Sequence, residues 1–167
     1  KAGREKFLQV AQALLGRPVD ENALLVGISG RYEFKNKGID VFIDAMGRLN
    51  RENNLAKEIL AFILVPAGHN GPNKELVHNM ELPYQSVDGG TPYLSDEPND
   101  PVMNRIKALK LRNSETDKVK IFFVPSYLNG DDGVFNMPYY DLLIGMDLTV
   151  FPSYYEPWGY TPLESLA

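Results

Sequence analysis

The sequence predicts an α/β fold, a Rossmann-like parallel sheet with helices on both faces. Four short apolar runs alternate with segments of helical periodicity, and each run is apolar throughout rather than at every second position. Continuous apolar strands of this kind are typical of a parallel sheet that is buried on both faces. The 167 residues are enough for one domain, and their composition, 44% hydrophobic and 23% charged, is that of a globular protein.

The first half of the chain predicts two helix–strand pairs. Residues 4–16 have apolar side chains at helical spacing and end on a glycine, and residues 23–29 form the first apolar strand. After a polar loop, residues 39–53 predict an amphipathic helix, and residues 58–67 predict the second strand. The predicted apolar face of the second helix consists of Ile39, Phe42, Ile43, Met46 and Leu49.

The second half repeats the pattern after an interruption. Residues 68–100 are rich in turn-forming residues and predict an excursion from the sheet. Within residues 68–118, only residues 101–111 have helical spacing. That strand is predicted at 119–125. A short helix with proline near its start follows at 137–146, and the fourth strand at 147–153.

Composition and charge exclude several classes of protein. A formal charge of −5 argues against a general nucleic-acid binder, which needs a basic surface. The longest apolar runs have only strand length and no secretory signal opens the chain, so we expect a cytoplasmic protein with no membrane partner. The absence of cysteine excludes disulfides and thiolate ligands. His69 and His78 lack the further ligands that a metal site needs, so we expect both on the surface and no bound metal.

Two loops that follow predicted strands carry unusual chemistry. Open parallel sheets bind ligands beyond the carboxyl ends of their strands, where helix N-termini present amide hydrogens. The first loop, residues 30–38, has three cations against one acid and a glycine at each end, Gly30 and Gly38. Arg31 can clamp two phosphate oxygens and Lys37 supplies a mobile charge, although a solvated basic loop would have the same composition. The loop lacks the glycine patterns of dinucleotide-binding and Walker loops.

The second loop, with the start of the helix that it leads into, occupies residues 153–167. Thr161, Pro162 and Glu164 fit a capping box with proline at the first helical position, so Glu164 has a structural explanation. Glu156 has no such local role, and a partly desolvated glutamate beside a helix N-terminus suits contact with sugar hydroxyls or a developing positive charge. For the neighbouring aromatic residues the simplest explanation is packing beneath the loop; they are Tyr154, Tyr155 and Trp158.

Two long stretches, ISGRYEFKNKGIDVFIDAMGRLN and VFPSYYEPWGYTPLES, closely resemble the eukaryotic-type glycogen synthases, a family of retaining glucosyltransferases. The resemblance covers nearly the whole chain apart from residues 68–90. It implies a GT-B enzyme, in which two Rossmann-like domains face each other across a cleft. Residues 1–167 would be part of the C-terminal, nucleotide-sugar-binding domain, whose partner is the missing N-terminal domain of the same chain. The segment after 58–67 is shorter than in eukaryotic members, so we expect a bacterial-type enzyme.

The activity that this resemblance implies is transfer of glucose from UDP-glucose to the non-reducing end of glycogen or another α-1,4-glucan, with retention at the anomeric carbon. UDP-glucose is then a donor substrate, and no cofactor is expected. The fragment itself would be inactive without the acceptor-side domain. Three alternatives remain open: ADP-glucose as donor, a different acceptor, or a non-catalytic module that binds a nucleotide sugar.

The resemblance also implies roles for individual residues. Arg31 and Lys37 would contact the donor phosphates, and Glu156 would be the catalytic carboxylate beside the transferring glucose. An aromatic residue in the helix before the fourth strand would stack on uracil; spacing from Glu156 gives Tyr139, with the adjacent Tyr140 as the alternative. Glu164 would hold ribose hydroxyls. The remaining residues of the expected donor site are Gly30, Trp158, Gly159, Tyr160 and Thr161.

Overall fold

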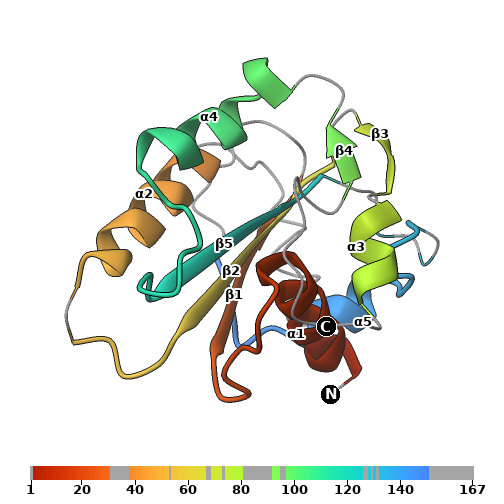
Figure 1. Cartoon of the computed structure of the whole chain (residues 1–167), viewed down its shortest axis with the longest axis horizontal. Helices are drawn as coiled ribbons and strands as arrows, with labels where there is room; N and C mark the ends of the chain where they lie inside the picture. The colour runs from red at the N-terminus through yellow and green to blue at the C-terminus, as the bar shows by residue number, and fades with distance from the viewer. Residues whose placement is uncertain are drawn as a thin grey trace, which may run out of the picture.

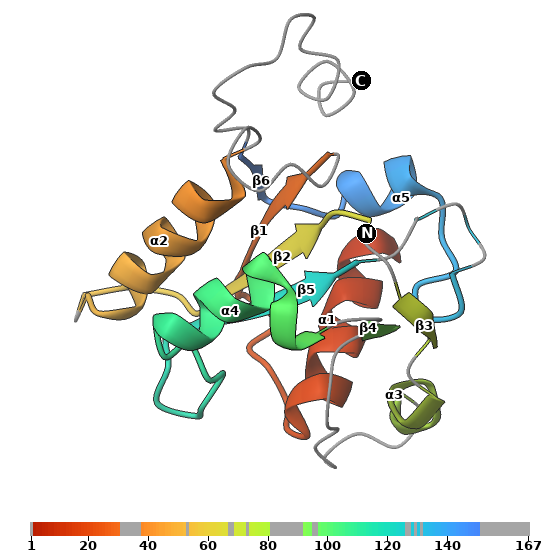
Figure 2. The same ribbon diagram turned by 90° about the horizontal axis from the view of Figure 1, so that it is seen from above.

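The computed structural model contains a four-stranded parallel sheet with helices on both faces, which confirms the predicted fold class (Figures 1 and 2). No helix in the described ranges combines the length and hydrophobicity that a bilayer span requires. The structure describes residues 2–30, 38–52, 54–66, 69–72, 74–80, 92–94, 97–125, 128, 130 and 132–150.

The sheet has the strand order β5–β2–β1–β6, and every neighbouring pair is parallel. Its strands are β1 (Leu24–Ser29), β2 (Ile59–Leu64), β5 (Val119–Val124) and β6 (Leu148–Thr149). Counted along the chain, this order is third–second–first–fourth, as in the first half of a Rossmann fold. All residues of β2 and β5 are buried, as their continuous apolar sequences predict. The predicted fourth strand is confirmed only at Leu148–Thr149, and residues 151–153 lie outside the described part of the chain.

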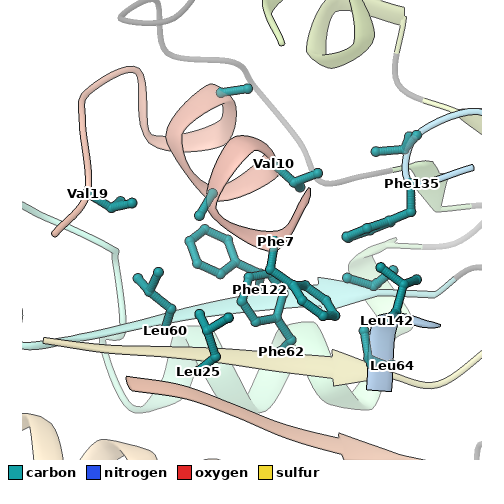
Figure 3. Close-up of a cluster of buried hydrophobic side chains, with 14 of the residues drawn as sticks. Phe7, Val10, Val19, Leu25, Leu60, Phe62, Leu64, Phe122, Phe135 and Leu142 are labelled. Carbon is teal, nitrogen blue, oxygen red and sulfur yellow. The ribbon is translucent and has the colours of Figure 1, made fainter. Parts of the chain in front are cut away.

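One face of the sheet is covered by α1 (Ala2–Leu15) and α5 (Tyr139–Leu143) (Figure 1). Phe7 of α1 lies 4.7 Å from Phe62 of β2 and 5.4 Å from Phe135, measured between ring centroids. Phe62 stacks in turn on Phe122 of β5, at 5.1 Å. Figure 3 shows these rings interleaved between α1 and the sheet. Full burial of one such side chain stabilises the fold by about 1.5–3 kcal/mol, so this cluster fixes α1 on the sheet.

The opposite face is covered by α2 (Ile39–Asn50) and α4 (Pro101–Ala108). The predicted apolar face of α2 is confirmed: four of its five residues are buried, and Leu49 packs partly buried against the same core. Asp100 caps α4, because its carboxylate accepts a hydrogen bond from Met103 N at 2.9 Å. Arg105 of α4 forms a two-point ion pair with Asp44 of α2, at 2.7 and 2.8 Å. Both partners are more than a third exposed, so the pair contributes little to stability.

Three predicted helices were too long. The helix predicted at 39–53 ends at Asn50, and the helix predicted at 137–146 spans only Tyr139–Leu143. The predicted helix 101–111 ends at Ala108, where Lys110 takes a left-handed conformation with φ 57°. Leu111 N then donates to Ile106 O and Lys110 N to Lys107 O, the two hydrogen bonds of a Schellman motif. This helix end could not be predicted from the residue type, because glycine usually occupies this position.

The segment between β2 and α4 contributes no strand to the main sheet in its described residues. It contains β3 (His69–Pro72), α3 (Lys74–Asn79), β4 (Pro92–Leu94) and a 3-10 turn at Glu97–Asn99. The two strands pair with each other, antiparallel. The expectation that only 101–111 is helical here was wrong, because α3 is helical as well. A six-residue helix is too short to show periodicity; its Leu76 is fully buried against the α1 side of the core.

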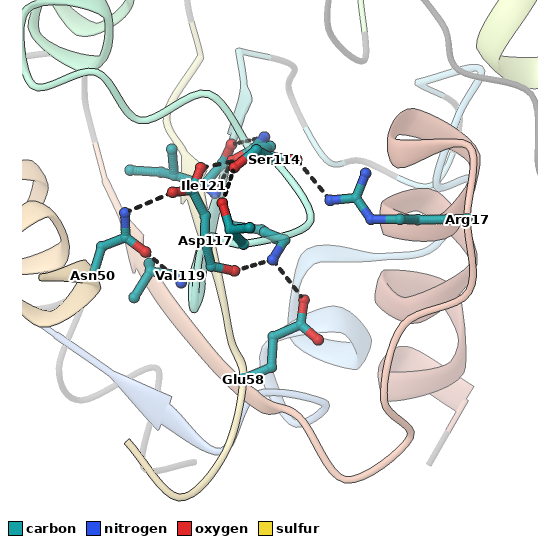
Figure 4. A network of polar contacts seen from close by, with 10 residues as sticks. Arg17, Asn50, Glu58, Ser114, Asp117, Val119 and Ile121 are labelled. Carbon is teal, nitrogen blue, oxygen red and sulfur yellow. Dashed lines mark hydrogen bonds and ion pairs between the residues drawn. The ribbon is translucent and has the colours of Figure 1, made fainter. Parts of the chain in front are cut away.

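Near the amino ends of the strands, which we call the amino edge of the sheet, side-chain hydrogen bonds cover the outermost strand β5 (Figure 4). Asn113, in the loop before the edge strand β5, accepts from Ile121 N at 2.8 Å and donates to Ile121 O at 2.9 Å. Asn50 at the end of α2 accepts from Val119 N at 3.0 Å. These amides occupy backbone groups that an edge strand otherwise offers to another chain.

Asp117 organises the same loop. Its carboxylate accepts from Asn50 Nδ2 at 3.0 Å and from Ser114 N at 2.9 Å, through different oxygens. Lys120, buried to 3% exposure, donates to the Asp117 carbonyl and lies 3.3 Å from Glu58. Burial alone would raise the pKa of Asp117, but the hydrogen bonds from Asn50 and Ser114 and the charge of Lys120 together hold it below its ordinary value of 3.8.

The N-terminus of α1 and the end of α5 approach each other through two glycines. A Cβ at Gly145 would lie 2.5 Å from the backbone nitrogen of Arg4, and a Cβ at Gly3 would lie 2.4 Å from the carbonyl oxygen of Asp141. Both distances fall far below van der Waals contact, and both neighbours are backbone atoms that cannot rotate away. The position of α5 beside α1 therefore requires glycine at both sites.

We expect Gly145→Ala to destabilise the full chain by about 1–3 kcal/mol, because the added methyl group forces the two backbones apart. Urea denaturation followed by circular dichroism measures the difference. The matched control is Ile144→Ala in the same turn, where the side chain is 70% exposed and the expected change is within about 0.5 kcal/mol. Equal effects of the two substitutions would contradict the close approach.

Asp117→Asn should reduce stability at neutral pH, because an amide offers one acceptor oxygen where the carboxylate uses two. Since the pKa of Asp117 is lowered on folding, its stabilising contribution is present above pH 3.8 and is lost as the pH falls through the folded value. The gap between the urea midpoints of wild type and variant should accordingly narrow below pH 3.8. If the difference between the two urea midpoints stayed constant across this pH range, the charge of the Asp117 carboxylate would contribute nothing to stability.

Candidate functional site at the carboxyl edge of the sheet

The candidate site lies where the order of strands reverses, between β1 and β6. From β1 the chain proceeds through α2 to β2 on one side, and later returns through α5 to β6 on the other side of β1. The connecting helices α2 and α5 lie on opposite faces of the sheet (Figure 2). Such a reversal separates the two adjacent strand-to-helix connections and opens a crevice at the carboxyl ends of the strands, the usual ligand position in open α/β sheets.

Both loops that the sequence singles out start at this reversal. Residues 31–37 follow Gly30, directly beyond the end of β1, and residues 151–167 follow Val150, directly beyond the end of β6. The two strands are paired, with Val26 opposite Leu148 and Gly27 opposite Thr149. The structure therefore brings together the origins of two loops that are more than a hundred residues apart in sequence.

Most of the predicted site residues lie outside the described part of the chain. Their assigned roles stay predictions, and so does the capping box at Thr161, Pro162 and Glu164. The residues concerned are Arg31, Lys37, Glu156, Trp158, Gly159, Tyr160, Thr161 and Glu164. Of the predicted donor site the structure describes Gly30 and Tyr139, and it places both at the carboxyl edge, next to Ser29.

Glycines hold both ends of the first loop. Gly30 has φ 137°, and no atom of the described residues lies within 4 Å of the place where its Cβ would be. Gly38 has the left-handed φ of 69° and is the N-cap of α2, where it offers no capping side chain. Its carbonyl accepts from Phe42 N at 3.0 Å, which begins the helix, and Asp40 accepts from Val41 N at 2.9 Å. The first turn of α2 thus starts at this edge with a glycine, and the amide of Val41 is already bonded to the Asp40 carboxylate.

Tyr139 reaches the end of β1 from the first residue of α5. Its hydroxyl lies 2.7 Å from the hydroxyl of Ser29, the last residue of β1, which is only 7% exposed. The Tyr139 ring packs partly buried against the α1 side of the core and meets the ring of Tyr140 edge-on, at 5.6 Å and 70°. Sequence analysis missed Ser29, because one serine at the end of an apolar strand carries no distinctive signal.

Tyr140, the alternative to Tyr139, is placed differently. Its side chain is 54% exposed, whereas Tyr139 is half-buried and joined to the end of β1. The ring that the structure holds at the carboxyl edge is therefore Tyr139. The choice of Tyr139 rather than Tyr140 as the residue that stacks on uracil stays a prediction.

The start of β6 is fixed by Asp147. Its carboxylate oxygen Oδ2 accepts from Leu25 N at 2.8 Å and from Arg4 Nη1 at 2.9 Å, and Asp147 N donates to Leu25 O at 2.9 Å. The same arginine donates to the carbonyls of Glu21 and Ala23 at 2.6 and 2.8 Å, so α1, the start of β1 and β6 meet at one guanidinium group. This arrangement sets the register of a strand that has only two residues.

A metal site finds no support among the described residues, where no group of three or more His, Asp and Glu side chains is placed to share an ion. His78 lies on the surface, as expected, and the side chain of His69 is outside the described part of the structure.

Comparison with known proteins identifies a family and several relatives, and the match to the family includes both loops of the candidate site. The sequence model of the family described as "Glycogen synthase" matches residues 18–88 and 76–167. Glycogen [starch] synthase isoform 1 of Saccharomyces cerevisiae is 28% identical over 208 aligned residues, and isoform 2 is 29% identical over the same length. The human liver glycogen [starch] synthase is 29% identical over 198 residues. Each alignment covers 86% of this chain but only 28–30% of the relative, so the chain spans less than a third of those proteins.

The alignments also locate a difference from these relatives. An alignment of 208 positions is longer than the 167-residue chain, so the yeast enzyme has residues here that this chain lacks. The two matched stretches of the family overlap at residues 76–88, inside the turn-rich segment 68–100, so we infer that the interruption lies there. Both loops of the candidate site lie outside this interruption.

Replacing Asp147 should show how β6 is held. We expect Asp147→Ala to destabilise the full chain by about 1–3 kcal/mol, because Leu25 N loses its acceptor beside a fully buried side chain. Asp147→Asn keeps an acceptor oxygen for Leu25 N and loses only the ion pair with Arg4, which is part-exposed, so its effect should be clearly smaller. Urea unfolding compares the two variants; equal losses would contradict a structural role for the bond to Leu25.

Proposed function

The chain belongs to the glycogen synthase family, and on this premise we propose that the whole protein is a glycosyltransferase that elongates glycogen. It would transfer glucose from UDP-glucose to the non-reducing end of an α-1,4-glucan and retain the configuration of the anomeric carbon. Residues 1–167 would supply part of the donor-binding half, and the acceptor-side N-terminal half of the same protein would complete the active site. We place this reaction in the cytoplasm.

One observation carries the proposal: the two loops with unusual chemistry leave neighbouring strands at the reversal point of the sheet. A sugar nucleotide has a base, a diphosphate and a sugar, and needs a site that recognises all three parts. The edge at β1 and β6 offers an aromatic ring at α5, a glycine-flanked basic loop before α2, and the carboxylate-bearing loop after β6. These parts match the chemistry of such a donor.

The diphosphate would be bound by the first loop. Arg31 directly follows Gly30 and Lys37 directly precedes Gly38 in the sequence, and both glycines lie at the carboxyl edge. As the glycosidic bond to the donor breaks, negative charge grows on the departing diphosphate. Arg31, Lys37 and the helix N-terminus after Gly159 would stabilise this charge, which is the task that a divalent cation performs in other transferases. We therefore expect no metal and no cofactor in the reaction.

The sugar and the ribose would be bound by the loop after β6. Glu156 is proposed as the catalytic carboxylate beside the transferring glucose, where it would stabilise positive charge at the anomeric carbon. Glu164 would accept hydrogen bonds from ribose hydroxyls, with one oxygen still able to cap the helix. The remaining contacts to glucose and phosphate are assigned to Trp158, Gly159, Tyr160 and Thr161, partly through backbone amides.

Tyr139 is the proposed platform for the base. Its ring lies at the carboxyl edge in the structure, beside the end of β1. Base–aromatic stacking contributes about 1–3 kcal/mol and tolerates different bases, so Tyr139 would supply affinity more than the choice between uracil and adenine.

A glucosyl-transfer assay on the intact protein, with glycogen as acceptor, tests the proposal. We expect transfer from UDP-glucose, and a loss of at least about a hundredfold in kcat in Glu156→Ala, since removing one group that stabilises transition-state charge typically costs this much. The matched control is Glu115→Ala, an exposed glutamate at the opposite edge of the sheet, which should leave the rate unchanged.

Two results would contradict the proposal in different ways. Transfer from ADP-glucose but not UDP-glucose would keep the enzyme class and change the donor. A Glu156→Ala variant that elongates glycogen at the wild-type rate would exclude the catalytic assignment.

A further inference from the structure

We propose that Ser29 is a positioning residue for nucleotide recognition, because it fixes the ring of Tyr139 at the carboxyl end of β1. The inference rests on the proposed function and deepens it, since it concerns the same donor site. Its central observation is the hydrogen bond between the two hydroxyls, which are 2.7 Å apart and 110 residues apart in sequence.

Ser29 is a rigid anchor. It is the last residue of β1, the strand that is hydrogen-bonded on both sides, to β2 and to β6. Its neighbour on the strand, Ile28, is 2% exposed, and Ser29 itself is 7% exposed. A buried hydroxyl at this position needs a partner, because an unsatisfied one would lose its hydrogen bond to water without replacement. Tyr139 provides that partner.

Tyr139, in contrast, belongs to a five-residue helix and would be less well fixed without the bond. Its backbone follows Pro138, whereas the buried side chains of α5, Leu142 and Leu143, and the glycine contact with α1 lie toward the other end of the helix. The Ser29 bond fixes the far end of the Tyr139 side chain, the core cluster contacts the ring, and Tyr140 meets the ring edge-on at 5.6 Å. Together these contacts set both the position and the plane of the ring.

A ring whose plane is already set loses little side-chain entropy when a base stacks on it. Preorganisation of this kind raises affinity for the bound nucleotide and leaves the chemical step largely unaffected. Tyr139 is the proposed platform for the base, and stacking on an aromatic ring tolerates different bases. Loss of the Ser29 hydroxyl should therefore weaken the binding of uridine and adenosine nucleotides by the same factor.

The test uses the intact protein with three substitutions, Ser29→Ala, Tyr139→Phe and the double variant. Each single change removes the same hydrogen bond and keeps the aromatic ring. We expect each to raise KM for UDP-glucose, and Kd for UDP by calorimetry, about two- to tenfold, with kcat changing less. The double variant should be no worse than either single one, because the bond can be lost only once.

Thr116→Val is the matched control. It removes another hydroxyl–hydroxyl hydrogen bond, between Ser114 and Thr116 at 3.1 Å, on the opposite edge of the sheet. Affinity for UDP should be unchanged in this variant. A lower melting temperature in Ser29→Ala with unchanged KM and Kd would mean that the bond is merely structural, and would overturn the inference.

Tyr139→Ala separates failure of the inference from failure of the proposed function. If this variant loses UDP affinity while Ser29→Ala and Tyr139→Phe retain it, the stacking role stands and the positioning role of Ser29 is wrong. Wild-type affinity in Tyr139→Ala would remove Tyr139 from the site and overturn the inference with it. An intact protein that neither binds UDP nor transfers glucose would overturn both.

Discussion

The pairing of β6 with β1 is the constraint on which the candidate site depends. β6 has two residues, and the bonds from Asp147 N to Leu25 O and from Val150 N to Gly27 O are its backbone links at either end. The Asp147 carboxylate adds a third link through Leu25 N and ties the strand to Arg4 of α1. Because the loop after β6 must start beside the loop after β1, a shift of this short strand by one position would separate the two halves of the site.

The two hydrophobic cores explain how a strand of two residues can be placed at all. α1 is fixed on the sheet by Phe7 between Phe62 and Phe135, and α5 is fixed on α1 by a backbone contact that only glycine permits at Gly3 and Gly145. The position of α5 relative to the sheet is therefore defined, and the few residues between α5 and β6 have little conformational freedom. Hydrophobic packing positions the helices, and local hydrogen bonds then set the register.

The sequence was sufficient for the layers of the fold and insufficient for its long-range bonds. Continuous apolar runs predicted the strands, and the face from Ile39 to Leu49 predicted how α2 packs. Lys110, which ends α4 in a left-handed conformation, could not be predicted, because its conformation is imposed by the burial of Leu111 rather than by its own preference. The bond between Ser29 and Tyr139 was equally hidden, since it depends on which strand lies beside which helix. The loops of the site could be singled out from charge and aromatic content, whereas their meeting point required the strand order.

The amino and carboxyl edges of the sheet, at the two ends of its strands, also differ in how their polar groups are bonded. At the amino edge the backbone groups of Ile121 and Val119 are bonded by the side chains of Asn113 and Asn50, and buried Lys120 is satisfied by Glu58 and the Asp117 carbonyl. The polar groups at this edge are thus bonded to one another. At the carboxyl edge β1 ends at Ser29 and is followed by Gly30, which has no atom of the described residues within 4 Å of its Cβ position, and α2 begins at Gly38, which brings no capping side chain. Among the described residues, the carboxyl edge thus has a glycine at each end of the first loop and one aromatic ring bonded to Ser29, which are features that the proposed donor site uses.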